Sequence, residues 1–500
     1  MNKLTRYSRL ALAALLCLCL TLGTLSLAAA ETQYRKIVFA YATFNNIPSE
    51  ETLATVEEAI NAVTRVKIGA EIKLKPIVIW DYTSTVSLAL QGGEQIDVFQ
   101  SLGDLNNAIS TGMALDLTDL MDTCAAESRA LIGDSWLAAC SHNGRLYGIP
   151  TYKPIALTPM LVYRQDIADE LGLDMTAVNS VGDITAVLAK VKAAKPDMTP
   201  LAAVNTGNIG LGLTIPNVDY LTDNYYSPKG VLMNDELTVV DYYASQAFAD
   251  TCALARGWYN DGLVMKDAAT TSSTAAELMA SGNYFAYIAS YSYPEADTAA
   301  SLEAQCGGYK LGAKIVGSAF LDTTSINALS WMVASTSSAP EEALKFINLT
   351  FTDPQIVNLI IYGLEGRDYV LSQDGFMSYP EGQEAASVPY TAQLSCGTLG
   401  NFFIMYPMAG TNTDSLAWEL EQNKTAKTSV AMGFTFDNSS VKTEYTAVTN
   451  VIDQYLPGLL CGSVDPATEI PVFLQRLAEA GLNDIIAAKQ TQLDSWVAAK

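Results

Sequence analysis

The chain has 500 residues, which is too long for one small hydrophobic core, so we expect two lobes or domains. It carries 53 acidic against 29 basic residues, a formal net charge of −24. This acidity disfavours nucleic acid and anionic membranes as partners and suits a neutral or cationic small molecule. The only histidine, His142, stands in a polar turn, where we expect it to be solvated, and this argues against His-rich zinc sites and Ser-His-Asp catalysis.

Residues 1–30 have the features of a secretory signal peptide. A basic start is followed by an almost wholly apolar run, and Ala28-Ala29-Ala30 matches the small-residue cleavage pattern. An uncleaved membrane anchor is the alternative, because the apolar run is long. Neither Cys17 nor Cys19 follows a small residue, so no convincing lipid-attachment motif is present. We expect an exported protein, extracellular or associated with the cell surface on the outer side of the cytoplasmic membrane.

Six cysteines follow the signal peptide: Cys124, Cys140, Cys252, Cys306, Cys396 and Cys461. An even number outside the cell favours disulfides, and Cys124 with Cys140 is the most plausible local pair. Buried free thiols are an equal alternative, because the cysteines are widely scattered.

Strands and helices alternate at the start of the mature chain. Residues 36–42 predict a buried strand, and Ser49 caps the helix that follows. A second strand in "AEIKLKPIVIW" places Trp80 among its packed residues, and a second helix over 84–91 is capped by Thr83. "QIDVFQ" is a third strand. This order predicts parallel crossovers and an α/β lobe.

The pattern of residue types changes near Gly144, where we expect the chain to cross into a second lobe. "SVGDITAVLAKVKAAKP" predicts a helix, "NYFAYIASYSYPEA" a strand with a polar end, and Pro340 the first turn of another helix. An amphipathic helix over 484–497 ends the chain, with Trp496 on its apolar side.

Two groups of segments resemble one known family. "LALQGGEQIDVFQSLGDLNNAISTGMALDLTDLM" and "NGRLYGIPTY" resemble recurring parts of family 1 extracellular solute-binding proteins of carbohydrate ABC importers. The later segments "APEEALKFINLTFTDPQIVNLIIYGLEGRDYVL", "MGFTFDNSSVKTEYTAVTNVIDQYLPGLLCGSVDP" and "LQRLAEAGLNDIIAAKQTQLDSW" are similar to the LipO-like subgroup, which has its own C-terminal region. The resemblance extends over nearly the whole mature chain.

The resemblance implies an α/β protein with the two-lobe, periplasmic-binding-protein-like (type II) fold and a ligand cleft that closes by a hinge motion. We expect an N-terminal lobe of 31–155 plus roughly 318–375, and a C-terminal lobe of 156–317 plus roughly 376–500, including the subgroup tail. The implied function is a receptor, without catalysis or cofactor, that captures a sugar or oligosaccharide and delivers it to permease subunits of an ABC importer. We expect a monomer with no nucleic-acid partner.

Ligands of open α/β sheets bind beyond the carboxyl ends of the strands, and this rule selects candidate residues. Aromatic rings would cover the apolar face of a sugar while amides, carboxylates and hydroxyls pair with its hydroxyl groups. We expect the plain Gln100 and Ser101 to contribute more than the conspicuous Trp80. The predicted ligand-binding residues are Thr43, Phe44, Asn45, Tyr82, Gln100, Ser101, Asp104, Tyr152, Trp258, Ser290, Tyr291, Tyr293, Asn401 and Tyr406.

Three other functions remain open at the level of sequence. A secreted glycoside hydrolase or lyase would need two opposed carboxylates, and among 53 acids no pair is singled out. A binding protein for another solute, such as a peptide, would share the same lobes. A surface interaction protein would have no small ligand at all.

Overall fold

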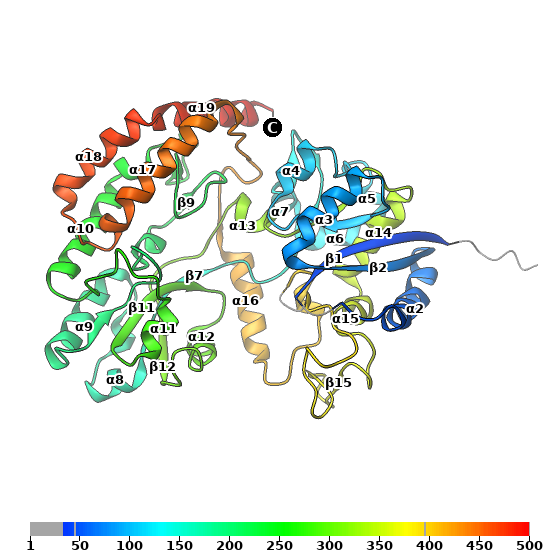
Figure 1. The fold of residues 1–500 in the computed structure, drawn as a ribbon, viewed down its shortest axis with the longest axis horizontal. Coiled ribbons are helices and arrows are strands. Elements are labelled where there is room, and N and C mark those ends of the chain that lie inside the picture. The colour runs from blue at the N-terminus through cyan, green and yellow to red at the C-terminus, as the bar shows by residue number, and fades with distance from the viewer. Residues whose placement is uncertain (1–33, 45–46, 395–396, 500) are drawn as a thin grey trace, which may run out of the picture.

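The structure, a computed structural model, describes residues 34–44, 47–394 and 397–499, so the predicted signal peptide, Asn45 and Cys396 lie outside it. The described chain forms two α/β lobes with helix α16 (Thr413–Thr425) between them (Figure 1). Three long helices at the C-terminus lie along the second lobe. Within the described residues, no helix combines the length and the apolar character needed to cross a membrane.

The first lobe is built on a five-stranded sheet in the order β2-β1-β3-β14-β6. Strands β1, β2 and β3 are parallel, whereas β14 runs antiparallel to β3. Figure 1 shows α3 above this sheet and α2 and α15 below it. The elements are β1 (Arg35–Thr43), α2 (Glu50–Lys67), β2 (Ala70–Val78), α3 (Ile79–Gln91), β3 (Val98–Gln100), β6 (Ile149–Pro150), β14 (Ser330–Val333), α14 (Pro340–Thr352) and α15 (Pro354–Tyr362).

Local signals place several of these elements where the sequence predicts them. The hydroxyl of Ser49 accepts a hydrogen bond from the amide of Thr52 and caps α2. Pro340 begins α14, where its missing amide proton leaves no broken bond. The predicted second helix is wrong at its start, because α3 begins at Ile79 directly after β2 and Thr83 lies inside it.

The second lobe contains a four-stranded sheet in the order β12-β7-β11-β8. Strand β11 is parallel to β8, and β7 is antiparallel to both of its neighbours. The predicted helix and strand of this lobe are confirmed as α9 and β11. The main elements are β7 (Thr158–Arg164), α9 (Val181–Ala194), β8 (Thr199–Leu201), α10 (Gln246–Asn260), β11 (Tyr284–Tyr291), α12 (Glu295–Leu302) and β12 (Leu311–Ile315).

The C-terminal tail packs on the second lobe through α17 (Lys442–Leu460), α18 (Pro466–Glu479) and α19 (Leu482–Ala498). A buried ion pair fixes this contact: the Lys489 ammonium lies 2.7 Å from the Asp223 carboxylate and donates a second bond, of 2.9 Å, to the carbonyl of Gly230. The hydroxyl of Tyr445 on α17 also donates to Asp223. Two helices of the tail therefore converge on one carboxylate of the second lobe.

A short strap, residues 429–434, leads into the tail and touches both lobes. Met432 is buried in the core of the first lobe, whereas Phe434 belongs to a core formed with the tail and stacks edge-on with Trp496. The amide of Gly433 donates to the hydroxyl of Thr323. The strap thus anchors the tail to the first lobe as well as to the second.

The core of the first lobe continues beyond the boundary that we expected near residue 375. Met377, Tyr390 and Leu399 are buried in the same cluster as Phe39 and Trp331. We propose that the first lobe comprises 34–155 and about 320–408, with α16 as a hinge helix and the tail joined to the second lobe.

Helix α16 holds the crossover between the lobes through Asn423. Its side-chain amide donates to the carbonyl of Lys153 at 2.6 Å, and its oxygen accepts from the amides of Ile155 at 2.9 Å and Ala156 at 3.1 Å. One buried side chain therefore satisfies three backbone groups of a crossing segment that has no sheet partner at those positions.

Replacing Asn423 by alanine should lower the free energy of unfolding by about 2–3 kcal/mol, because three buried backbone groups lose their partner. Urea denaturation measures this change. Lys424→Ala, one position along on the exposed face of the same helix, is the control and should have an effect within about 0.5 kcal/mol. Equal effects of the two variants would contradict the clamping role of Asn423.

The cysteines that the structure describes are buried, and the histidine is exposed. Cys124, Cys140, Cys252, Cys306 and Cys461 are all buried free thiols, so the alternative without disulfides holds for these five. The pair of Cys124 and Cys140 is not bonded; the Cys140 sulfur contacts the hydroxyl of Ser330 instead. His142 is exposed, as predicted.

Candidate functional site

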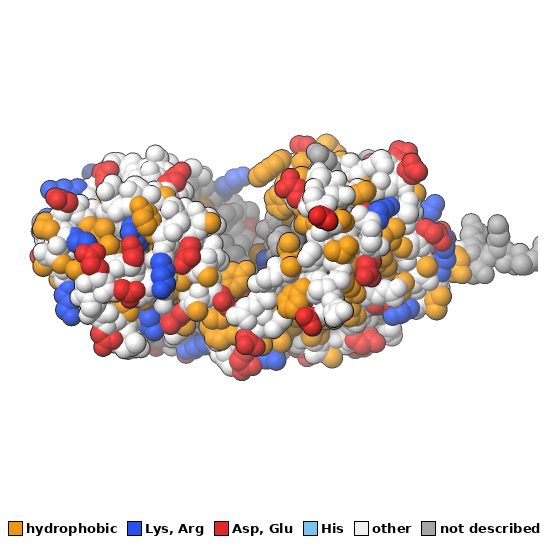
Figure 2. All heavy atoms as spheres, turned by 90° about the horizontal axis from the view of Figure 1, so that it is seen from below, with side chains coloured by type: hydrophobic (Ala, Val, Ile, Leu, Met, Phe, Trp, Pro, Cys, Tyr) orange, Lys and Arg blue, Asp and Glu red, His pale blue; other side chains and the backbone are white. Residues whose placement is uncertain are grey.

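The carboxyl ends of β1, β2 and β3 lie on one edge of the first sheet, because the three strands are parallel. In Figure 1 β1 runs from the outer side of the first lobe toward the second lobe, so this edge faces the second lobe. Thr43 ends β1, Gln100 ends β3, and Trp80 stands in the first turn of α3, directly after β2. Seen from below, the molecular surface is hollowed between the two lobes (Figure 2).

Trp80 is the most exposed large hydrophobic side chain among the described residues, with 85% of its surface accessible. The prediction that it packs at a strand end is wrong, because it follows the strand and lies in the helix. Helix α3 turns Tyr82, Val86, Ala89 and Leu90 toward the core and leaves Trp80 outside. An indole ring therefore stands in water at the edge where the three parallel strands end.

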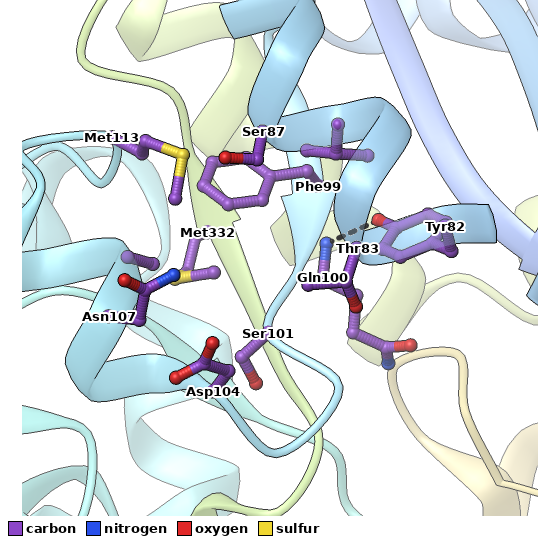
Figure 3. Close-up of a pocket in the computed structure, with 12 residues that line it drawn as sticks. Tyr82, Thr83, Ser87, Phe99, Gln100, Ser101, Asp104, Asn107, Met113 and Met332 are labelled. Carbon is purple, nitrogen blue, oxygen red and sulfur yellow. Dashed lines mark hydrogen bonds between the residues drawn. The ribbon is translucent and has the colours of Figure 1, made fainter. Parts of the chain in front are cut away.

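Tyr82, expected near the cleft rim, is instead a buried connector, 1% exposed. Its hydroxyl donates to the carbonyl of Ala40 and accepts from the amide of Gln100 at 2.8 Å (Figure 3). It links β1 to β3 and thereby fixes the position of Gln100. Its role is structural support of the edge.

A small pocket opens beside Gln100 on this edge. Phe99, Met113 and Met332 give it an apolar floor, and polar side chains stand around it (Figure 3). The space inside is only about 20 Å³, room for about one water molecule and not for a sugar ring. The polar lining residues are Thr83, Ser87, Gln100, Ser101, Asp104 and Asn107.

Gln100 and Ser101 are both buried, and each has a structural bond. The Gln100 amide nitrogen donates to the carbonyl of Thr398 at 2.6 Å, and the Ser101 hydroxyl accepts from the amide of Ser330 at 3.1 Å. Within the described chain, the Gln100 Oε1 atom is buried without a hydrogen-bond partner. That oxygen is a buried acceptor at this edge that lacks a donor among the described residues.

The corresponding edge of the second lobe is formed by the end of β11, which continues past its last pair with β8 (Ala286 with Leu201) and ends at Tyr291 beside Thr158 of β7. Ser290 and Tyr291 finish β11, and Tyr293 follows with 44% of its surface exposed. The hydroxyls of Tyr287 and Tyr291 are 2.8 Å apart, which orients the Tyr291 ring. The predicted residues of this strand end are thus brought together in one short segment.

A buried carboxyl group under this segment was not predicted from the sequence. Glu419 of α16 is 2% exposed, and its Oε1 accepts from the Ser292 hydroxyl at 3.2 Å. Burial raises the pKa of Glu419 to about 7, and the nearby Asp297 adds to the rise. The signal for it in the sequence is weak: Ser415, Glu419 and Asn423 repeat every fourth residue, a polar stripe on a helix whose buried face is normally apolar.

Several other predicted contacts prove to be structural. Trp258 is buried in the second-lobe core, where its indole nitrogen donates to Thr185, so it does not reach the cleft. Asn401 is also buried, and its side-chain amide donates to the carbonyl of Phe351 while its side-chain oxygen accepts from the amide of Phe403.

Of the remaining predicted ligand-binding residues, some are buried or half-buried and others are exposed. Tyr152 is buried and pairs with Asn401 through the backbone, so the structure brings these two predicted residues together inside the first lobe. Tyr406 is half-buried beside Tyr369. Phe44 is 57% exposed just after Thr43, and Asp104 is exposed at the start of α4 (Leu105–Ser110). Only the last two of these extend the exposed strand-end edge.

Two α/β lobes that present polar and aromatic residues to each other across a hollow define a two-lobe binding protein. Residues 59–356 match the family described as bacterial extracellular solute-binding protein, and residues 430–498 match a domain of unknown function (DUF3502). The chain belongs to the bacterial extracellular solute-binding proteins. The predicted family, with a separate C-terminal region, is confirmed, and the glycoside hydrolase alternative is set aside because this is a family of binding proteins.

Similar proteins extend over almost the whole chain. A carbohydrate ABC transporter substrate-binding protein of Streptococcus pneumoniae is 23% identical over 444 residues, which cover 88% of this chain and 87% of that protein. The crystal structure of the N-glycan transport solute binding protein NgtS from the same species is 21% identical, with a TM-score of 0.73, and covers 92% of this chain and 98% of its own. An extracellular solute-binding protein of Bifidobacterium longum subsp. infantis is 15% identical, with a TM-score of 0.65, and covers 93% of this chain and 99% of its own. The predicted two-lobe type II fold is confirmed.

Proposed function

We propose that this protein captures a sugar or oligosaccharide between its lobes and delivers it to the permease subunits of an ABC importer. The observation that supports this most is the exposed Trp80 at the start of α3, a helix that also contributes Thr83 and Ser87 to the polar lining of the strand-end pocket. The relatives support the same ligand class, since one is named for carbohydrate import and another for N-glycan transport.

The chemistry of the two edges suits a carbohydrate. An aromatic face covers the C–H face of a pyranose ring, and Trp80 and Tyr293 offer such faces on opposite lobes. Sugar hydroxyls both donate and accept, and a buried hydroxyl without a partner costs about 1–3 kcal/mol. The partnerless Gln100 oxygen on one edge and Glu419 beneath the other are suitable acceptors.

Titration calorimetry of the mature chain tests this function. The panel is maltotriose, cellotriose, xylotriose, mannotriose, kestose and N-acetyllactosamine, with a tripeptide and free amino acids as the other arm. We expect at least one glycan to bind with micromolar or better affinity, equivalent to about −8 kcal/mol. Binding to the tripeptide or amino acids with no glycan binding would contradict the proposed ligand class.

Binding should also close the lobes, because a ligand that contacts both edges favours the state in which they approach each other. Small-angle scattering should show a smaller radius of gyration with the bound glycan than without it. We further propose that the protein works as a monomer outside the cytoplasmic membrane and that the permease recognises its closed form. An unchanged radius of gyration at saturating glycan would contradict the closure.

A further inference from the structure

The buried face of helix α16 consists of three polar residues, Ser415, Glu419 and Asn423. The side chains of Ser415 and Asn423 have hydrogen-bond partners. The Ser415 hydroxyl donates to the carboxylate of Asp297 on α12, and Asn423 clamps the crossover segment. Glu419 lies between them, one turn from each. Only one of its two oxygens is engaged, by the Ser292 hydroxyl.

The second oxygen, Oε2, is buried and has no hydrogen-bond partner within the described chain. A buried carboxyl oxygen without a donor is unfavourable, so such groups in native proteins are rare and are normally satisfied in some functional state. Besides burial, the charged group among the described residues that raises the pKa of Glu419 is Asp297, which is also acidic and cannot donate to the carboxylate. A donor from outside the described residues would satisfy this oxygen, whereas a proton on Glu419 would only remove its charge.

The position of Glu419 suggests where that donor comes from. Ser292 and Tyr293 follow the carboxyl end of β11, on the cleft-facing edge of the second lobe, and Ser292 bonds directly to the carboxyl group. Tyr293 is also close, since the charge of Glu419 contributes to the raised pKa of its phenol. Glu419 therefore lies beside the end of β11, where the rule of strand ends places a ligand.

We propose that Glu419 is a ligand-binding residue of the hinge helix, whose Oε2 accepts a hydrogen bond from a hydroxyl group of the bound sugar. The assignment rests on the proposed function and adds a specific polar contact to it. Because Asn423 of the same helix holds the crossover, a sugar bound to Glu419 contacts the element that joins the lobes. Ligand and hinge then share one rigid helix.

The variant Glu419→Gln tests the proposal because its two expected effects have opposite signs. The folded-state pKa of about 7 lies above the ordinary value of 4.5, so the stability that this carboxyl contributes is full below pH 4.5 and lost as the pH rises through 7. Glutamine removes that loss, and the variant without ligand should melt at a higher temperature than the wild type at pH 8 but not at pH 4.5. Its affinity at pH 8 for the glycan that binds the wild type best should fall about tenfold, because a charged acceptor is lost.

Glu421→Gln makes the same chemical change on the exposed face of α16 and should alter neither quantity. Wild-type affinity in Glu419→Gln would overturn the proposal while leaving the proposed function intact. Weaker binding together with a lower melting temperature at pH 8 would also overturn it, because this is the signature of a structural role. If the wild type binds no glycan of the panel, the proposed function and this inference fall together.

Discussion

Replacing Lys489 by methionine should lower the free energy of unfolding by about 3–5 kcal/mol, the largest loss that we expect from a single substitution here. The ammonium and the Asp223 carboxylate are both almost fully buried, and methionine leaves that carboxylate without its cation. Lys229 lies near the same site but has its own bonds to Ser227, so it replaces Lys489 only in part. Urea denaturation measures the loss, and hydrogen exchange should locate it in α17 and α19.

Two further variants separate the ion pair from general damage. Lys442→Met makes the same change on the exposed first turn of α17 and should stay within about 0.5 kcal/mol of the wild type. Adding Asp223→Asn to Lys489→Met removes the stranded charge and should recover part of the loss. If the double variant is as unstable as the sum of the two single ones, Lys489 and Asp223 do not act as a pair.

Replacing Trp80 by alanine should weaken glycan binding by about tenfold to a hundredfold, because a ring that becomes buried against a sugar contributes about 1.5–3 kcal/mol. The melting temperature of the protein without ligand should not change, because the side chain is 85% exposed and supports little of the core. Titration calorimetry with the best glycan measures the effect. Trp80→Phe should lose less, because it keeps a smaller aromatic face.

Leu88 provides the matched control for Trp80. It is 70% exposed on the same helix, two turns further from the strand-end edge. Leu88→Ala removes exposed apolar surface of α3 without touching the edge, so its glycan affinity should equal that of the wild type. Equal losses in both variants, or none in Trp80→Ala, would place the binding surface elsewhere.

The order of elements in the fold could be predicted because its signals are local. The Ser49 cap, Pro340 at a first turn and the parallel β1, β2 and β3 all follow from short stretches of sequence. The burial of Met377 and Tyr390 in the first-lobe core could not be predicted, because it depends on contacts with residues far away in the chain. No periodic pattern records such contacts.

The candidate site shows the same division. Strand ends alone selected Gln100, Ser101 and the segment after β11. The structure places them at the ends of β3 and β11, and their contact with a ligand stays a prediction. Trp80 was assigned the wrong environment because the alternation of β2 was extended by two residues, past the point where α3 begins. Glu419 was missed because nothing in its own sequence distinguishes it from the other acids. Its hydrogen-bond partner, Ser292, is 127 positions away in the chain.

The strap of residues 429–434 bears on how far this chain can be shortened or recombined. With Met432 inside the first lobe and Phe434 stacked on Trp496, a cut just before the tail would open apolar holes in two places at once. The tail is therefore not a detachable module, although the match to the solute-binding family ends at residue 356. Chimeras that exchange ligand specificity between relatives should keep strap, tail and both lobes from one parent and graft only the strand-end residues.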